Sequence, residues 1–151
     1  MKHWLMKSEP DAFSIDDLAK VGTEPWSGVR NYQARNFMRQ MTPGDLVFFY
    51  HSSTAEPAIV GIAEVASTPY PDPTQFQKKS PYFDPKATRE QPRWDLVDVR
   101  FVRRFAAPVT LEAMKQVAAL EGFALLQRGS RLSVLPVTPA QWKTILKLDK
   151  G

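Results

Sequence analysis

The chain has 151 residues, no cysteine and a formal net charge of +4. A chain of this length suits one domain, so we expect a single core over residues 1–151 without disulfide or metal staples. The absence of cysteine excludes thiol catalysis and cysteine-type zinc sites, and it fits a reducing, cytoplasmic location. No stretch approaches the ~18 apolar residues of a membrane span, so we expect a soluble protein without a membrane partner.

The charge is unevenly distributed between the two halves of the chain. Residues 1–75 carry 6 basic and 9 acidic side chains, a balance of −3, whereas residues 76–151 carry 14 and 7, a balance of +7. A modest basic surplus of this kind is compatible with a polyanionic partner, but many proteins of similar charge bind no nucleic acid.

The first part of the chain predicts a strand, two helices and two further strands. Residues 2–7 read as the first strand, and Ser14 with Asp17 three positions later predicts a capped short helix. A longer helix follows Asn31, because apolar residues recur there at the spacing of one buried helix face. The runs 46–51 and 58–66 are apolar enough to be buried strands, the first of them on both sides.

Residues 68–93 form a long, proline-rich connection that contains Tyr70, Phe76, Tyr82 and Phe83. Connections of this length in a compact domain are often functional, and the aromatics predict that this one packs against the domain. Three of them, Tyr70, Tyr82 and Phe83, are candidates for a lid, although the sequence leaves open whether the connection covers a pocket.

The remainder predicts a long strand, a helix, a short strand and a last helix. Residues 94–105 alternate between apolar and polar positions, Thr110 caps a helix that runs to Leu120, and Thr138-Pro139 opens a helix after a strand at 132–137. This order of elements indicates an α+β fold with a mixed, mainly antiparallel sheet curled into an open barrel, and with helices over its ends.

No catalytic or metal-binding motif stands out. His51 is followed by Ser52 and Ser53, but no nucleophile signature surrounds these serines, and a nuclease or small-molecule hydrolase using His51 remains an alternative. The phosphate-binding glycine motifs are absent, and the two histidines, His3 and His51, lie far apart in the sequence. We therefore expect a protein without enzymatic activity, metal or cofactor.

Polar and aromatic residues gather at the ends of the predicted elements. They occur in Lys7-Ser8-Glu9-Pro10, in the stretch from Trp26 to Tyr32, in Tyr50-His51-Ser52, and in 128–133. Each has a structural interpretation: Trp26 and Tyr32 as core aromatics, Asn31 as a helix cap, and Arg128 as a solvated charge. Flat rings beside guanidinium and amide groups are also typical of a site for a planar, polar, anionic ligand such as a nucleotide.

These motifs together resemble the EVE domain family, a member of the PUA-like group. The resemblance rests on Trp4-Leu5-Met6-Lys7-Ser8-Glu9-Pro10, Trp26 to Asn36, Gly44-Asp45 with Phe49 to Ser52, and Arg128-Gly129-Ser130-Arg131-Leu132-Ser133-Val134. It implies a PUA-like pseudobarrel with a pocket at its mouth. It also implies a non-enzymatic reader that accepts a flipped modified base, chiefly a modified cytosine such as 5-hydroxymethylcytosine in DNA.

The resemblance suggests roles for twelve residues. Trp26 and Tyr32 are the candidate stacking walls, Asn31 suits the base edge, and Arg30 is a candidate phosphate contact, as are Arg35 and Arg39. The polar rim would comprise Lys7, Ser8 and Ser52, and the edge or flanking-phosphate contacts would come from Arg128, Ser130 and Ser133.

The partner is less sharply indicated than the pocket. The chain lacks a strongly basic tail or a fused nuclease, so we expect a monomer that binds weakly or acts with a partner protein. Modified DNA, modified RNA and a free nucleotide-like molecule all remain possible ligands.

Overall fold

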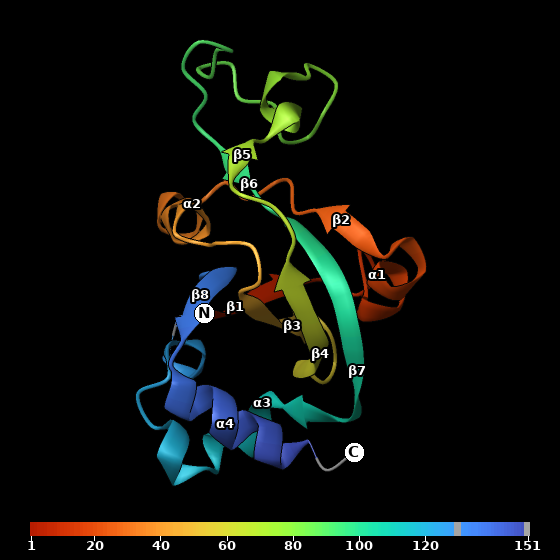
Figure 1. Ribbon diagram of the computed structural model, residues 1–151, viewed down its shortest axis with the longest axis vertical. Helices are drawn as coiled ribbons and strands as arrows, with labels where there is room; N and C mark the ends of the chain where they lie inside the picture. Colours follow the sequence, from red (N-terminus) through yellow and green to blue (C-terminus); the bar gives the residue numbers. More distant parts are fainter. Residues whose placement is uncertain (129–130, 150–151) are drawn as a thin grey trace.

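A curled sheet forms the centre of the computed structural model, which describes residues 1–128 and 131–149 (Figure 1). Its strand order is β2-β7-β4-β3-β1-β8. The strands are β1 (His3–Ser8), β2 (Thr23–Pro25), β3 (Leu46–His51), β4 (Ala58–Val65), β7 (Asp98–Thr110) and β8 (Val134–Val137). Strands β1 and β3 pair in parallel and the other neighbours are antiparallel. The predicted α+β fold with a mixed, mainly antiparallel half-barrel is therefore confirmed.

Helices lie around both ends of this half-barrel (Figure 1). Helices α1 and α2 lie towards one end, and α3 and α4 towards the other. The bounds are α1 (Ile15–Val21), α2 (Tyr32–Arg39), α3 (Leu111–Lys115), α4 (Pro139–Leu148), and the short 3-10 turns η1 (Pro73–Phe76), η2 (Ala118–Leu120) and η3 (Ala124–Leu126). None of the helices in the described ranges is long and apolar enough to cross a membrane.

Strand β3 separates two hydrophobic clusters because its alternate side chains point to opposite faces of the sheet. Val47 and Phe49 pack in the cluster that contains Trp26 and Met38, whereas Phe48 packs in the cluster near α4. Burial on both sides explains why this strand is almost continuously apolar, as predicted. Strand β3 ends at the same end of the half-barrel as the parallel strand β1, since His51 is paired with Ser8.

The helix starts follow the predicted caps. Ser14 and Asp17 form a reciprocal capping box on α1, and Thr138 forms one with Gln141 on α4. The helix after Thr110 is shorter than predicted: α3 ends at Lys115, and a 3-10 turn over 118–120 follows. Val117 has an extended backbone (φ −99°, ψ 111°), which interrupts the helix between these two pieces.

Residues 68–93, here called the 68–93 segment, contain more structure than a plain connection. The segment includes β5 (Tyr70–Pro71), which pairs with β6 (Asp95–Leu96), and it projects beyond α2 (Figure 1). Its centre is polar, because the buried Gln75 amide donates to the carbonyls of Asp72 and Trp94 and accepts from the backbone N–H groups of Arg93 and Trp94. Hydrogen bonds therefore fix the segment more than its aromatic residues do: Tyr70 and Tyr82 remain exposed.

Candidate functional site

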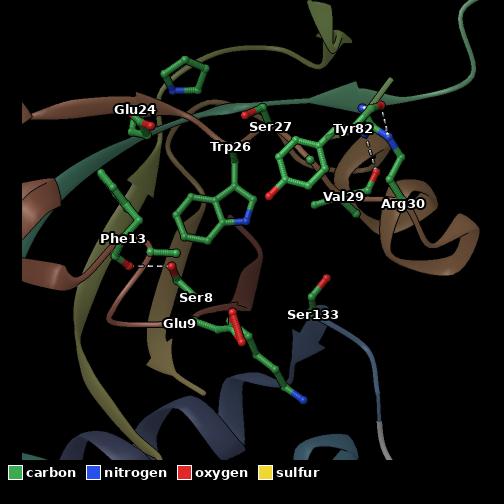
Figure 2. A pocket seen from close by; sticks show the side chains of 14 residues that line it. Ser8, Glu9, Phe13, Glu24, Trp26, Ser27, Val29, Arg30, Tyr82 and Ser133 are labelled. Atoms are coloured by element: carbon green, nitrogen blue, oxygen red, sulfur yellow. Dashed lines mark hydrogen bonds between the residues drawn. The ribbon is translucent and has the colours of Figure 1, made fainter. Parts of the chain in front are cut away.

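A pocket of about 400 Å³ opens at the rim where β1 and β2 end (Figure 2). Its volume lies within the range of small-molecule sites. The β1 end, the β1–α1 turn, the β2 turn, the 68–93 segment and the approach to β8 all contribute. The lining residues are Lys7, Ser8, Glu9, Ala12, Phe13, Glu24, Pro25, Trp26, Ser27, Gly28, Val29, Arg30, Tyr82 and Ser133.

Trp26 forms the back of this pocket and is only 9% exposed. Its indole contacts the rings of Phe13 and Phe49 edge-on, at centroid distances of 6.5 and 5.6 Å. Its backbone N–H donates to the carbonyl of Val97 (2.9 Å) and so ties the turn to the strand region behind it. The sequence-predicted wall residue therefore lines the pocket from a rigid position.

Tyr82 supplies a second aromatic wall from the 68–93 segment. Its ring lies directly on Gly28: a Cβ atom built on Gly28 would stand 2.7 Å from Cζ of Tyr82. Gly28 also has a φ of +88°, which L side chains rarely adopt. The close approach and the backbone conformation both require glycine here, and together they bring the tyrosine ring to the pocket (Figure 2).

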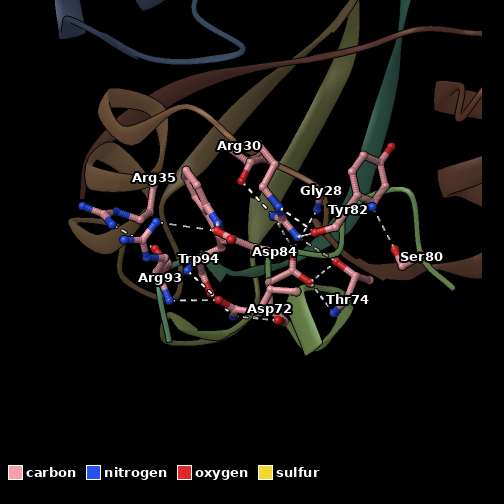
Figure 3. A network of polar contacts seen from close by, with 12 residues as sticks. Gly28, Arg30, Arg35, Asp72, Thr74, Ser80, Tyr82, Asp84, Arg93 and Trp94 are labelled. Atoms are coloured by element: carbon pink, nitrogen blue, oxygen red, sulfur yellow. Dashed lines mark hydrogen bonds and ion pairs between the residues drawn. The ribbon is translucent and has the colours of Figure 1, made fainter. Parts of the chain in front are cut away.

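Arg30 anchors the 68–93 segment (Figure 3). Its guanidinium pairs with Asp72 (3.2 Å) and donates to the hydroxyl of Thr74 (3.0 Å) and to the carbonyl of Tyr82 (2.7 Å). Asp72 is fully buried and also accepts from the backbone N–H of Gly28 (2.7 Å). Arg30 thus lines the pocket, as predicted. Its N–H donors are already bonded within the protein. This geometry favours a role in positioning Tyr82 and not the predicted contact with a phosphate.

Tyr32 lies outside the pocket, in contrast to the stacking wall suggested by the sequence. It is 50% exposed and stacks on Trp94 at a centroid distance of 4.8 Å. The guanidinium of Arg35 covers it, with Cζ 4.7 Å from the ring centroid. Tyr32 is the first residue of α2, and its stacking on Trp94 joins the start of this helix to the residue that directly follows the 68–93 segment.

Asn31 also has a local role. Its side-chain oxygen accepts from the backbone N–H of Ala34 (2.9 Å), which makes Asn31 the N-cap of α2. Its side chain does not line the pocket. The structural interpretation of this residue, that of a helix cap, describes its position better than the base-edge role suggested by the family resemblance.

Lys7 and Ser8 of the predicted rim line the pocket, and so does Ser133, a predicted contact of the base edge or a flanking phosphate. The Ser8 hydroxyl donates to the carbonyl of Phe13 (2.5 Å), and burial lowers the pKa of Lys7. Within residues 1–128 and 131–149, no carboxylate forms an ion pair with Lys7, so its ammonium is available to an anionic or carbonyl oxygen.

Two further predicted site residues, Ser52 and Arg128, do not line this pocket. Ser52 lies at the end of β3, where its backbone N–H donates to the carbonyl of Ser8 (3.0 Å), but it is not a lining residue. Arg128 is exposed and does not line the pocket, and Ser130 lies outside the described residues. Two glutamates that sequence reasoning did not select, Glu9 and Glu24, do line it.

His51 has a structural position at the start of α1. Its Nε2 accepts from the backbone N–H of Ile15 (3.1 Å), its ring contacts Phe49 edge-on, and burial lowers its pKa. A nitrogen that already accepts this hydrogen bond is not free to act as a general base. In the two described ranges, no group of three or more potential metal ligands occurs either.

The position of His51 predicts a pH dependence of stability. Because its pKa is lowered on folding from the usual 6.5, the folded state binds a proton less readily than the unfolded chain. Stability is therefore full above pH 7 and falls as the pH decreases through about 6.5. Burial lowers the pKa of His3 as well, so His51→Gln should weaken this dependence without removing it. Urea unfolding between pH 7.5 and 5.5 would measure this dependence. If the free energy of unfolding changed equally with pH in the wild type and in His51→Gln, His51 would not be a source of the dependence.

Comparison with known proteins identifies the family of this chain. The sequence model that describes the EVE domain family matches residues 2–148. The chain belongs to the EVE domain family. This EVE domain is 41% identical to human thymocyte nuclear protein 1 over an alignment of 167 positions, which covers 98% of the chain and 74% of that protein.

Solved structures show the same similarity in three dimensions. The EVE domain matches a Pseudomonas syringae protein of 54% identity with a TM-score of 0.94, over 97% of this chain and 99% of the other. It matches human THYN1 protein in complex with 5-methylcytosine containing DNA with a TM-score of 0.95 and 39% identity, over 100% and 99% of the two chains.

Proposed function

We propose that this EVE domain binds DNA without catalysing a reaction and holds a modified cytosine, flipped out of the duplex, in the pocket between Trp26 and Tyr82. The observation that carries the proposal is the pocket of about 400 Å³ with the aromatic rings of Trp26 and Tyr82 on its walls. It is supported by the TM-score of 0.95 with human THYN1 protein in complex with 5-methylcytosine containing DNA.

The energetics of base flipping explain why aromatic walls are needed. Extruding a base costs a few kcal/mol of lost stacking and pairing. Stacking on an aromatic side chain returns about 1–3 kcal/mol per base, and hydrogen bonds to the base edge contribute further. Trp26 and Tyr82 provide ring surface, while Lys7, Ser8 and Ser133 place polar groups on the rim.

The distribution of charge indicates that the pocket, more than a general basic surface, must supply affinity. Many surface arginines are already neutralised: Arg39 pairs with Asp95, Arg100 with Glu64, Arg103 with Asp149 and Arg104 with Asp16. Phosphate contacts are then left to exposed basic residues without an ion pair in the described part of the chain, such as Lys78, Lys79 and Arg131. Few phosphate contacts give weak non-specific binding and a shallow dependence on salt.

Affinity measurements on matched duplexes test the proposal. The duplexes carry one cytosine, 5-methylcytosine or 5-hydroxymethylcytosine at the same position, and binding is followed by fluorescence anisotropy at fixed salt. We expect tighter binding of a modified duplex, and we expect Trp26→Ala to lose roughly 1–3 kcal/mol of that binding because an aromatic wall of the pocket is removed. Tyr32→Ala is the matched control: it should keep the preference for the modified base, because Tyr32 does not line the pocket.

Two outcomes would change this assignment. Equal affinity for all three duplexes, unaffected by Trp26→Ala, would contradict a base-reading pocket. An RNA of the same sequence, carrying the same modified cytosine, is included as a competitor. If the RNA displaces the DNA at a lower concentration than unlabelled DNA does, the pocket reads modified RNA instead.

A further inference from the structure

The indole N–H of Trp26 has no acceptor in the described part of the protein. The N–H groups of Trp4 and Trp94 donate to Asp45 (3.0 Å) and Asp84 (2.7 Å), but the Trp26 side chain makes no such hydrogen bond. Among the described residues, no fully buried polar side-chain atom lacks a partner, so this N–H must open onto the pocket. Figure 2 shows the indole nitrogen on the edge of the ring that faces the pocket, in the direction of Tyr82. A bound ligand can therefore accept this hydrogen bond.

Glu24 is the complementary group on the β2 side of the pocket. Its side chain is half-buried and lines the pocket, but within residues 1–128 and 131–149 it has no ion pair or hydrogen bond. Burial without a partner raises the pKa of Glu24, because a carboxylate that loses water without gaining a donor is destabilised. A ligand that brings an N–H donor to this carboxylate would compensate for the lost hydration.

Cytosine and thymine differ in the groups that these two residues would meet. Cytosine carries an exocyclic amino donor at C4 and acceptors at N3 and O2, whereas thymine carries a carbonyl at C4. A carboxylate accepts a hydrogen bond from the amino group of cytosine, but it meets another oxygen acceptor at the same position of thymine. The methyl group of thymine is identical to that of 5-methylcytosine, so ring size and the C5 substituent cannot separate the two bases.

We infer that Glu24 and the indole N–H of Trp26 each hydrogen-bond to the flipped base, and that Glu24 makes the pocket prefer cytosine to thymine. The inference rests on the proposed function, because it assumes that a base enters the pocket. The base then meets the in-plane N–H edge of the Trp26 indole and stacks on the ring of Tyr82, and Glu24 is a specificity-determining residue.

The test uses duplexes in which 5-methylcytosine or thymine stands opposite an abasic site. Neither base then has to break a Watson–Crick pair. Differences in affinity therefore reflect contacts of the base in the pocket more than the cost of opening the duplex. The proteins are the wild type, Glu24→Gln, Trp26→Phe and the control Trp142→Phe. Trp142 is also buried and its N–H also has no acceptor among the described residues, but it stacks on Phe48 in the other hydrophobic cluster, away from the pocket.

The wild type should bind 5-methylcytosine at least about tenfold more tightly than thymine, which is the scale of one well-placed edge contact. Glu24→Gln should reduce this ratio to within about threefold, because an amide both accepts from an amino group and donates to a carbonyl. Trp26→Phe keeps a ring but removes the N–H, and should weaken 5-methylcytosine binding about fivefold to tenfold. Trp142→Phe should leave affinity and ratio unchanged.

An unchanged base preference in Glu24→Gln, or unchanged 5-methylcytosine affinity in Trp26→Phe, would overturn this inference while leaving the proposed function intact. The proposed function itself fails if the wild type binds both duplexes no better than one that is abasic on both strands at that position. Thermal unfolding checks the variants: Glu24→Gln should be at least as stable as the wild type, because it removes a desolvated charge without breaking a contact.

Discussion

Replacing Asp72 by alanine should lower the free energy of unfolding by about 3 kcal/mol and should sharply reduce binding of modified DNA. Asp72 is fully buried and accepts hydrogen bonds from Gly28, Arg30 and Thr74. Without it, the Arg30 guanidinium loses its counter-charge and the Gly28 N–H loses its acceptor. The 68–93 segment then loses the connection that holds Tyr82 at the pocket. Urea unfolding and duplex titration measure the two effects.

Asp16→Ala is the matched control for this prediction. Asp16 also pairs with an arginine, Arg104 (2.6 Å), but both side chains are more than half exposed. Exposed ion pairs contribute about 0–1 kcal/mol, so the control should be nearly as stable as the wild type and should bind DNA normally. An Asp72→Ala protein that matches this control in stability and in affinity would show that the segment is not held by this aspartate.

Gly28→Ala should destabilise the protein by about 2–4 kcal/mol and displace Tyr82 from the pocket wall. The substitution combines two effects. Alanine is strained at a φ of +88°, and its Cβ would stand within 3.0 Å of three ring atoms of Tyr82. The aromatic ring must therefore move, and affinity for a modified duplex should fall with it. Thermal or urea unfolding and duplex titration check both parts.

The two effects can be separated with variants that the chain itself offers. Gly44 has a φ of +96° but nothing within 4 Å of its Cβ position, so Gly44→Ala reports the backbone strain alone. The double variant Gly28→Ala/Tyr82→Ala removes the overlap but keeps the strain. We expect the double variant to be about as destabilised as Gly44→Ala, but to bind DNA weakly. If Gly28→Ala and Gly44→Ala have the same stability and affinity, the contact with Tyr82 has no role.

Local features of the fold were readily predicted from the sequence. The capping boxes at Ser14 and Thr138 depend on side chains three positions apart, and the two-sided burial of 46–51 follows from a continuous apolar run. The parallel pairing of β1 with β3 was not predicted, because it joins strands about 40 residues apart and no local pattern records it. The same reason applies to the pairing of β5, which lies in the region predicted to be a connection, with β6.

The residues that line the candidate pocket were predicted in part. Trp26, Lys7, Ser8, Arg30 and Ser133 line the pocket, whereas Tyr32, Asn31, Ser52 and Arg128 do not. Tyr32 follows the helix cap directly, and the direction of its side chain depends on how α2 packs on the 68–93 segment. Tyr82 was only one of three lid candidates because its place depends on the long-range pair between Arg30 and Asp72. Glu24 was missed because a single glutamate in a short strand carries no motif.

Base extrusion into the pocket is the central claim, and 2-aminopurine fluorescence tests it most directly. A duplex carries 2-aminopurine beside a single 5-methylcytosine, so its fluorescence rises when the neighbouring base leaves the stack. At saturating wild-type protein we expect a clear rise that follows the binding curve. We expect little rise with Trp26→Ala, even at concentrations that bind the duplex. Full complex formation by the wild type with unchanged fluorescence would show that the DNA is bound with its bases stacked, and would contradict the account.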